Sequence, residues 1–175
     1  MTALTFRVFG TPAPAGSKTV VPTARGPRVL DGGSKAAREH RRTWRSDVID
    51  AARTAMTDAD WRTVEGPVAL TLALIVPRPK SLPRQRRDGT VPQPITRPDL
   101  TKLLRATEDA ITAAGVWRDD SQVVRLVVDK VYEDLGYPPG AIVTVAPQPA
   151  RRRRRLLGLD RRHRPRLRAR VGRRS

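Results

Sequence analysis

The chain has 175 residues, only 4% aromatic residues and no cysteine, which predicts one domain with an aliphatic core and excludes disulfides, thiolate zinc sites and a cysteine nucleophile. No apolar run approaches the length of about 18 residues that a membrane span needs, and no N-terminal signal segment is visible, so we expect a soluble protein in a reducing cytoplasm. The net charge of +18 predicts affinity for a polyanion, most readily nucleic acid, but does not by itself indicate an enzyme.

The first strand and the loop after it are predicted near the N-terminus. Residues 4–9 alternate as a strand does, and residues 10–18, rich in proline and glycine, are typical of a loop. In this loop Ser17 and Lys18 offer a hydroxyl and an ammonium group that suit a phosphate. A solvated loop is the simpler explanation from composition alone, so phosphate binding at these two residues is a hypothesis.

A short strand at residues 28–30 is predicted to precede a long helix. Ser34 is the expected N-cap, and the apolar periodicity runs to about Met56. His40 in this helix is expected to be a surface residue and not a metal ligand or base. The outer face of the helix carries arginines that are either solvated or in contact with phosphate, namely Arg41, Arg42, Arg45 and Arg53.

The middle of the chain combines an apolar strand with a long proline-rich segment. Residues 68–76 are apolar on both faces and predict a central strand covered by helices on at least one side. Residues 77–98 contain six prolines and five basic residues before Asp88, so neither a helix nor a central strand is expected there. We expect a mobile basic loop that closes over bound DNA, and the alternative is a disordered insertion without a role.

Residues 97–124 contain a predicted helix with acidic residues at both ends. Pro98 disfavours helical geometry before it, Asp99 suits the N-cap, and Gly115 suits a left-handed C-cap. The helix between them spans roughly 15 residues, or about 22 Å. The pair Asp119–Asp120 follows the C-cap, so it approaches Asp99 only if the chain turns back.

Two further strands are predicted to complete the domain. Residues 123–133 and 141–145 form them, joined by a turn over residues 135–140. The order strand, helix, strand, loop, helix, strand, strand predicts an α/β (α+β) fold in which two main helices pack against a mixed sheet. This domain is expected to cover residues 1–146.

The C-terminal residues 147–175 differ in composition from the domain. Residues 151–175 contain thirteen arginines and one aspartate, a net charge of +12, which leaves +6 for residues 1–150. Such a segment cannot bury enough apolar surface to fold alone, so we predict a disordered Arg-rich tail. The tail either adds nonspecific DNA affinity or is an accidental extension of the reading frame.

The pattern Asp-Leu-x-x-Leu, a helix and then Ala-Gly-Val-Trp-x-Asp-Asp-x-Gln-Val resembles the signature of RusA-type Holliday junction resolvases. The resemblance is close over residues 97–124 and extends in outline over most of residues 1–146. It implies a RusA-like fold and a homodimer that cuts four-way DNA junctions by paired symmetric nicks, in recombination and repair of phage or prophage origin. It also implies Mg²⁺ as cofactor, with Mn²⁺ as a substitute, no small-molecule cofactor, no membrane association and a place in the bacterial cytoplasm.

The resemblance also implies a set of site residues. Divalent cations held by clustered carboxylates activate water and stabilise charge in phosphodiester cleavage, and Mg²⁺ needs only one or two protein carboxylates. Asp99 and Asp120, with Asp119, meet that need if they converge; otherwise Asp99 is a helix cap and the pair is an exposed turn. Arg105 is the third expected catalytic residue, because its permanent charge suits the phosphoryl oxygens. The expected contacts to nucleic acid are Ser17, Lys18, Arg97 and Lys102.

One position departs from the family pattern. Where the family has a second acid two residues after the first, this chain has Thr101, a neutral and weak metal ligand. We expect reduced cleavage that favours Mn²⁺. Two alternatives stand beside this expectation: a catalytically impaired relative that binds branched DNA, and a basic RNA- or ribosome-associated protein in which the aspartates are coincidental.

Overall fold

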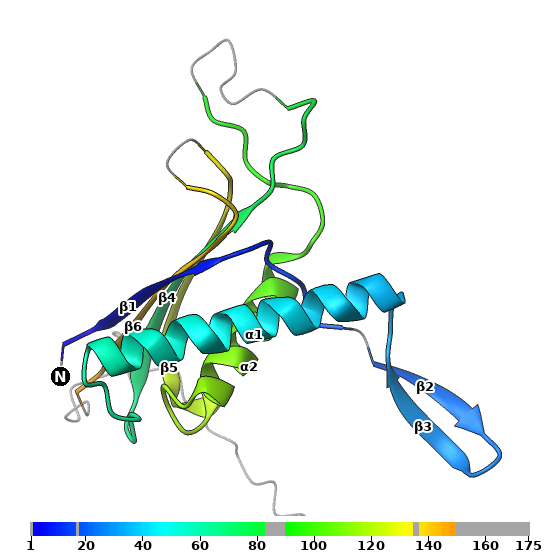
Figure 1. Ribbon diagram of the computed structural model, residues 1–175, viewed down its shortest axis with the longest axis horizontal. Coiled ribbons are helices and arrows are strands. Elements are labelled where there is room, and N and C mark those ends of the chain that lie inside the picture. The colour runs from blue at the N-terminus through cyan, green and yellow to red at the C-terminus, as the bar shows by residue number, and fades with distance from the viewer. Residues whose placement is uncertain (1, 17, 83–89, 135–136, 150–175) are drawn as a thin grey trace, which may run out of the picture.

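The computed structural model describes residues 2–16, 18–82, 90–134 and 137–149, and Figure 1 shows how its elements are arranged. Four strands form one sheet in the order β1-β6-β4-β5. β5 runs parallel to β4, whereas β6 runs antiparallel to β4 and to β1, so the sheet is mixed. The strands of this sheet are β1 (Leu4–Phe9), β4 (Val68–Val76), β5 (Val123–Tyr132) and β6 (Gly140–Pro147).

Two helices, α1 (Lys35–Asp58) and α2 (Leu100–Ala114), pack on one face of this sheet (Figure 1). Alternate residues along β4 are almost fully buried and form one core with Trp44 of α1 and Leu103 of α2. On the other face Thr71 of β4 is exposed. The predicted α+β fold, with two main helices against a mixed sheet, is confirmed, and β4 is covered by helices on one side.

β4, α2 and β5 form a β-α-β unit in which the helix connects two neighbouring parallel strands. Parallel strands start at the same end of a sheet, so the connecting helix has to run back in the opposite direction. The N-terminus of α2 therefore lies near the end of β5, and the C-terminus of α2 lies near the start of β5. This arrangement decides where the acidic residues lie.

The predicted caps of both helices are present, with one difference in detail. The Ser34 side chain accepts a hydrogen bond from the backbone N–H of Ala37 at 3.2 Å, as an N-cap does. Gly115 ends α2 with φ at +89°, the left-handed geometry predicted for it. Asp99 occupies the N-cap position of α2 in extended geometry, but its side chain makes no capping hydrogen bond. The expectation that its carboxylate caps the helix is therefore wrong.

A β-hairpin was missed in the sequence. β2 (Lys18–Thr23) and β3 (Gly26–Asp31) pair antiparallel over their full length, where only a loop and a short strand at residues 28–30 were expected. Pro22 and Pro27 face each other across the hairpin and obscure the strand signal, because proline is depleted in strands. Figure 1 shows the hairpin projecting from the body of the protein beside the start of α1.

The proline-rich segment and the tail are described only in part. Residues 77–82 and 90–98 contain no helix or strand, in agreement with the prediction for this loop. Its central residues 83–89 and the arginine-rich residues 150–175 lie outside the described residues, so the predictions of a mobile loop and a disordered tail are untested. Within the described ranges, no helix is long and apolar enough to cross a membrane.

Candidate active site

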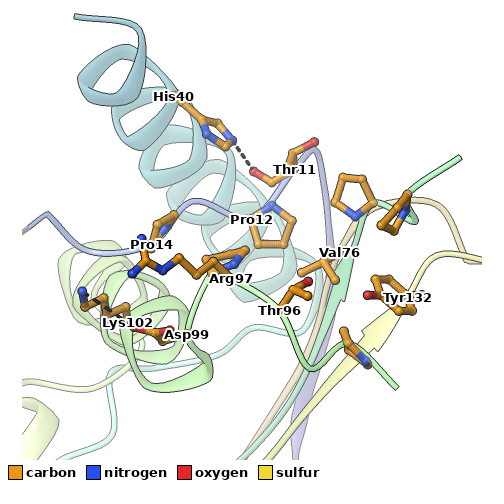
Figure 2. A pocket seen from close by; sticks show the side chains of 14 residues that line it. Thr11, Pro12, Pro14, His40, Val76, Thr96, Arg97, Asp99, Lys102 and Tyr132 are labelled. Carbon is orange, nitrogen blue, oxygen red and sulfur yellow. Dashed lines mark hydrogen bonds and ion pairs between the residues drawn. The ribbon is translucent and has the colours of Figure 1, made fainter. Parts of the chain in front are cut away.

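Asp99 lies exposed at the start of α2 with its carboxylate free of the helix backbone. Lys102, one turn further along, places its Nζ 3.7 Å from the Asp99 carboxylate (Figure 2), and both side chains are more than half exposed. An ion pair this exposed contributes little, in the range of about 0–1 kcal/mol. The Asp99 oxygens are therefore available to a cation, because neither the helix cap nor Lys102 holds them firmly.

A cavity of about 620 Å³ opens beside Asp99. Figure 2 shows its walls: the segment after β1 with Thr11 and Pro14, His40 from α1, and Tyr132 at the end of β5. The Nε2 of His40 donates a hydrogen bond to the Thr11 carbonyl at 2.9 Å. His40 is exposed, and its bond ties α1 to the segment after β1.

Lys130 of β5 fixes the segment that leads to Asp99. Its Nζ donates to the carbonyls of Thr96 at 2.9 Å and of Pro98 at 3.0 Å. Lys130 pairs with Leu74 in the sheet register, so it points to the face that the helices cover. Sequence reasoning missed this residue, although a lysine at an inward position of an apolar strand was a visible signal.

The second acidic end follows α2. Asp119 caps the short 3-10 helix η1 (Asp120–Gln122), and its carboxylate accepts the backbone N–H of Ser121 at 2.9 Å. These hydrogen bonds from Ser121 hold the pKa of Asp119 below its usual range. Asp120 is exposed and carries no capping role, so it is the freer ligand of the two.

Gln122 holds this acidic turn in place with all of its polar capacity. Its Oε1 accepts the backbone N–H groups of Arg118 at 2.8 Å and of Asp119 at 3.0 Å. Its Nε2 donates to the carbonyls of Val64 at 2.9 Å and of Gly66 at 2.8 Å. A glutamine in the Asp-Asp-x-Gln pattern therefore has a structural explanation: it joins the acidic turn to the connection before β4.

Glu108 of α2 lies close enough to Asp120 to feel its charge. Partial burial raises the pKa of Glu108 above its ordinary value, and the carboxylates of Asp120 and Asp109 raise it further. The sequence analysis did not select Glu108. The adjacent acids Glu108 and Asp109 in the middle of the predicted helix were the available signal.

The two acidic ends do not meet within one chain. Asp99 precedes the first residue of α2 and the Asp119–Asp120 pair follows its last, and α2 has 15 residues, so the helix separates them by roughly 22 Å. β5 does not bring the two ends together. It starts beside Asp120 and runs the length of the helix, so that Lys130 near its end lies beside Asp99. Among the described residues there is no group of three or more histidine, cysteine, aspartate or glutamate side chains that could hold a metal. The convergence that the sequence analysis required is therefore absent from the single protomer.

The remaining candidates lie around the start of α2. Arg97 and Lys102 line the cavity beside Asp99. Arg105 and Thr101 are exposed on α2 and line a second cleft together with Lys102. Ser17 and the side chain of Lys18 lie outside the described residues, so their expected contacts to nucleic acid are untested.

The donor set at both ends consists of carboxylate oxygens, which suits a hard divalent cation such as Mg²⁺ or Mn²⁺. The chain has no cysteine, and His40, which lines the cavity beside Asp99, donates its Nε2–H to the Thr11 carbonyl, so carboxylate oxygens are the main ligands offered here. Asp99 is exposed and lies near Lys102, and Asp120 is exposed and lies near Glu108. Each aspartate alone supplies one carboxylate ligand.

Comparison with known proteins assigns the chain to a family. One curated relative, the uncharacterized protein YqaN of Bacillus subtilis (strain 168), is 30% identical over 76 residues, which cover 41% of this chain and 53% of the relative. The chain thus matches about half the length of that relative. Residues 19–146 match the family described as Endodeoxyribonuclease RusA, and this range spans the hairpin, both helices and the strands that carry the acidic ends. Because the match covers well over half of the sequence, the chain belongs to the RusA endodeoxyribonuclease family.

Proposed function

We propose that this protein is a metal-dependent endodeoxyribonuclease that resolves four-way DNA junctions as a homodimer. Family membership supports the reaction class. Exposed carboxylates at Asp99 and Asp120 support a site for Mg²⁺ or Mn²⁺. A setting in phage or prophage recombination, inside the bacterial cell, is part of the same proposal.

The observation that carries the dimer is the separation of Asp99 and Asp120 in one chain. β5 is an edge strand, paired with β4 on one side, and it exposes Val124 (59%) and Leu126 (45%). An edge of this kind, with free backbone groups and exposed apolar side chains, is a template for pairing with another strand.

Two copies that pair along β5 around a two-fold axis run antiparallel to each other. The start of β5 in one copy then lies beside the end of β5 in its partner. Asp120 precedes the start, and Lys130, which holds the segment before Asp99, lies near the end. Such a dimer brings Asp120 of one copy toward Asp99 of the other at two symmetric places, as paired nicking of a two-fold junction requires.

At each place Asp99 and Asp120 would hold the cation, which when bound supplies an activated water and charge neutralisation for phosphodiester hydrolysis. Lys130 keeps the segment before Asp99 in position, and Gln122 keeps the turn of Asp120 in position. Arg105 lies exposed on α2, and its permanent positive charge suits the oxygens of the scissile phosphate. Asp119 serves mainly as a cap and is an additional ligand.

Thr101 favours a second candidate function. Its exposed hydroxyl stands where the family has an acid, so the site carries one negative charge fewer toward a cation. The second candidate is therefore a branched-DNA-binding relative with impaired cleavage. Thr101→Asp should raise the cleavage rate tenfold or more, a barrier change of about 1.4 kcal/mol, and an unchanged rate would place the site elsewhere.

A synthetic four-way junction incubated with Mg²⁺ or Mn²⁺ tests the function directly. Paired symmetric nicks that disappear in Asp120→Asn support the nuclease. Tight complexes without nicks support the impaired relative, and preference for RNA over the junction refutes both. Calorimetric titration of Mn²⁺ into the wild type and Asp120→Asn tests the metal role, since equal binding by the two proteins would reject it.

A further inference from the structure

A second cleft lies between the two helices, beside the candidate active site. It has a volume of about 880 Å³ and runs between the outer sides of α1 and α2. Its lining includes small residues, Ala15, Gly16 and Ala106. Lys102 lines both this cleft and the cavity that holds Asp99, so the two hollows are neighbours. A chain lying in the cleft passes directly to Asp99.

The cleft is strongly one-sided in charge. Asp109 is its one acidic lining residue among those described. The cationic lining residues are Arg38, Arg41, Arg42, Arg45, Lys102 and Arg105. A hollow lined by one sign of charge focuses its field and attracts counter-ions of the opposite sign.

The arginines of the cleft differ in how the protein engages them. Arg38 and Arg41 donate to the carbonyls of Gly33 at 2.7 Å and Gly32 at 2.8 Å, and so hold the turn before α1. Arg45 and Arg105 make no hydrogen bond or ion pair with any described residue. Arg42 has only a 3.9 Å contact with Glu39, in which both side chains are mostly exposed.

Several guanidinium groups that line one cleft with few acidic partners repel one another, and this repulsion is relieved when a polyanion binds. Arginine suits phosphate in particular, because its planar fork donates two parallel hydrogen bonds to phosphate oxygens. Arg38, Arg42 and Arg45 are four and three residues apart and so share one face of α1 along the cleft, as contact with a repeating phosphate backbone requires. Gly16 gives room to the Arg41 guanidinium, which lies 3.2 Å from where a Cβ would stand.

We propose that the cleft between α1 and α2 binds the phosphate backbone of a duplex arm of the DNA substrate and leads it to Asp99. Arg42 and Arg45 of α1 and Arg105 of α2 are its principal contacts. The choice of DNA as the polyanion rests on the proposed function, whereas the phosphate chemistry follows from the cleft itself. From the sequence alone the α1 arginines fit either solvent or phosphate, and the cleft favours phosphate.

The test is the salt dependence of binding to a labelled four-way junction in EDTA, where no cleavage occurs. The full-length double variant R42Q/R45Q removes two cleft charges and keeps residues that favour a helix. Each lost phosphate contact lowers the slope of log K against log salt by about 0.9, so the slope should fall by about 1.8 and binding should weaken roughly tenfold or more.

The matched control is R53Q/R62Q, which removes two exposed arginines that do not line the cleft. Its slope should change by less than half as much. Equal loss in both variants would reduce the effect to bulk charge and overturn the proposal, as would an unchanged slope in R42Q/R45Q. Displacement of the junction by a duplex RNA at lower concentration than by duplex DNA would also overturn it. Circular dichroism confirms that both variants are folded.

This experiment separates the cleft from the nuclease. If the salt slope falls in R42Q/R45Q but the wild type never nicks a junction with Mg²⁺ or Mn²⁺, the nuclease is refuted and the cleft is supported. A wild type that nicks, with R42Q/R45Q binding as the wild type does, refutes the cleft alone.

Discussion

Single side chains hold the two acidic ends of α2 in place. Gln122 does so at one end through four hydrogen bonds, two of them donated to carbonyls of the connection before β4. Lys130 does so at the other end through two. Both residues bind backbone groups beside a candidate carboxylate and do not contact the carboxylate itself.

Replacing Gln122 with alanine should destabilise the protein by about 1–3 kcal/mol, because backbone groups in a partly buried turn lose their partners. Urea unfolding measures the change. Arg62→Ala is the control, since Arg62 is exposed in the same connection before β4 and takes no part in the turn. Equal free energies of unfolding for Gln122→Ala and the wild type would show that the turn holds its shape without this side chain.

Glu108 makes stability depend on pH. Because its pKa is raised above the ordinary value of 4.5, the folded state binds the proton more tightly, and stability is lost as the pH rises from the unfolded pKa through the folded one. Glu108→Gln should therefore have a higher melting temperature than the wild type at pH 7. The gain in free energy of unfolding should be less than about 1 kcal/mol, because the carboxylate is only partly buried. The two melting temperatures should converge below pH 4.5. A variant that melts lower at pH 7 would contradict the raised pKa.

At the scale of elements, the helix caps show which predictions local sequence supports. Ser34 and Gly115 were predicted correctly because a cap depends on its own turn. Pro98 and Asp99 gave the right start of α2, but the Asp99 side chain makes no capping bond and lines a cavity whose other walls come from distant segments. Local pattern does not contain that information.

The two N-caps make a matched pair of substitutions. Ser34→Ala should cost about 1 kcal/mol, because it removes a capping hydrogen bond. Asp99→Asn should change the free energy of unfolding by less than about 0.5 kcal/mol, because its side chain makes no such bond. Thermal or urea unfolding of both variants compares them. A large loss in Asp99→Asn would show that this carboxylate is structural.

The sheet explains why the site was harder to predict than the fold. The apolar run at residues 68–76 and the strand from Val123 were both recognised, and so were the helices between and before them. The parallel pairing of β4 with β5 was not predicted, and it makes α2 run in the direction opposite to both strands. Once β4 and β5 are parallel, Asp99 and Asp120 have to lie at opposite ends. The hairpin β2–β3 was missed because its two prolines contradict strand propensity.

At the scale of the whole molecule, the separation of Asp99 and Asp120 bears on how many copies of the chain a metal site needs. Under the proposed function, a chain that carries Asp99 at one end of α2 and Asp120 at the other would complete a two-carboxylate site only with a second copy. The proposed dimer would then be part of the active site as well as a match to the symmetry of the junction. The exposed edge of β5 is the surface that fits this role.

Subunit mixing tests this account most directly. Asp99→Asn and Asp120→Asn homodimers should each fail to nick a four-way junction with Mn²⁺. Co-expressed as a mixture, they form heterodimers in which one site has both substitutions and the other has none, so nicking of single strands should return. Mixing Asp99→Asn with the double variant Asp99→Asn/Asp120→Asn is the control, because no intact site can form. Nicking restored only in the first mixture is the result we predict, and no recovery there, with heterodimers present, would contradict a site shared between two copies.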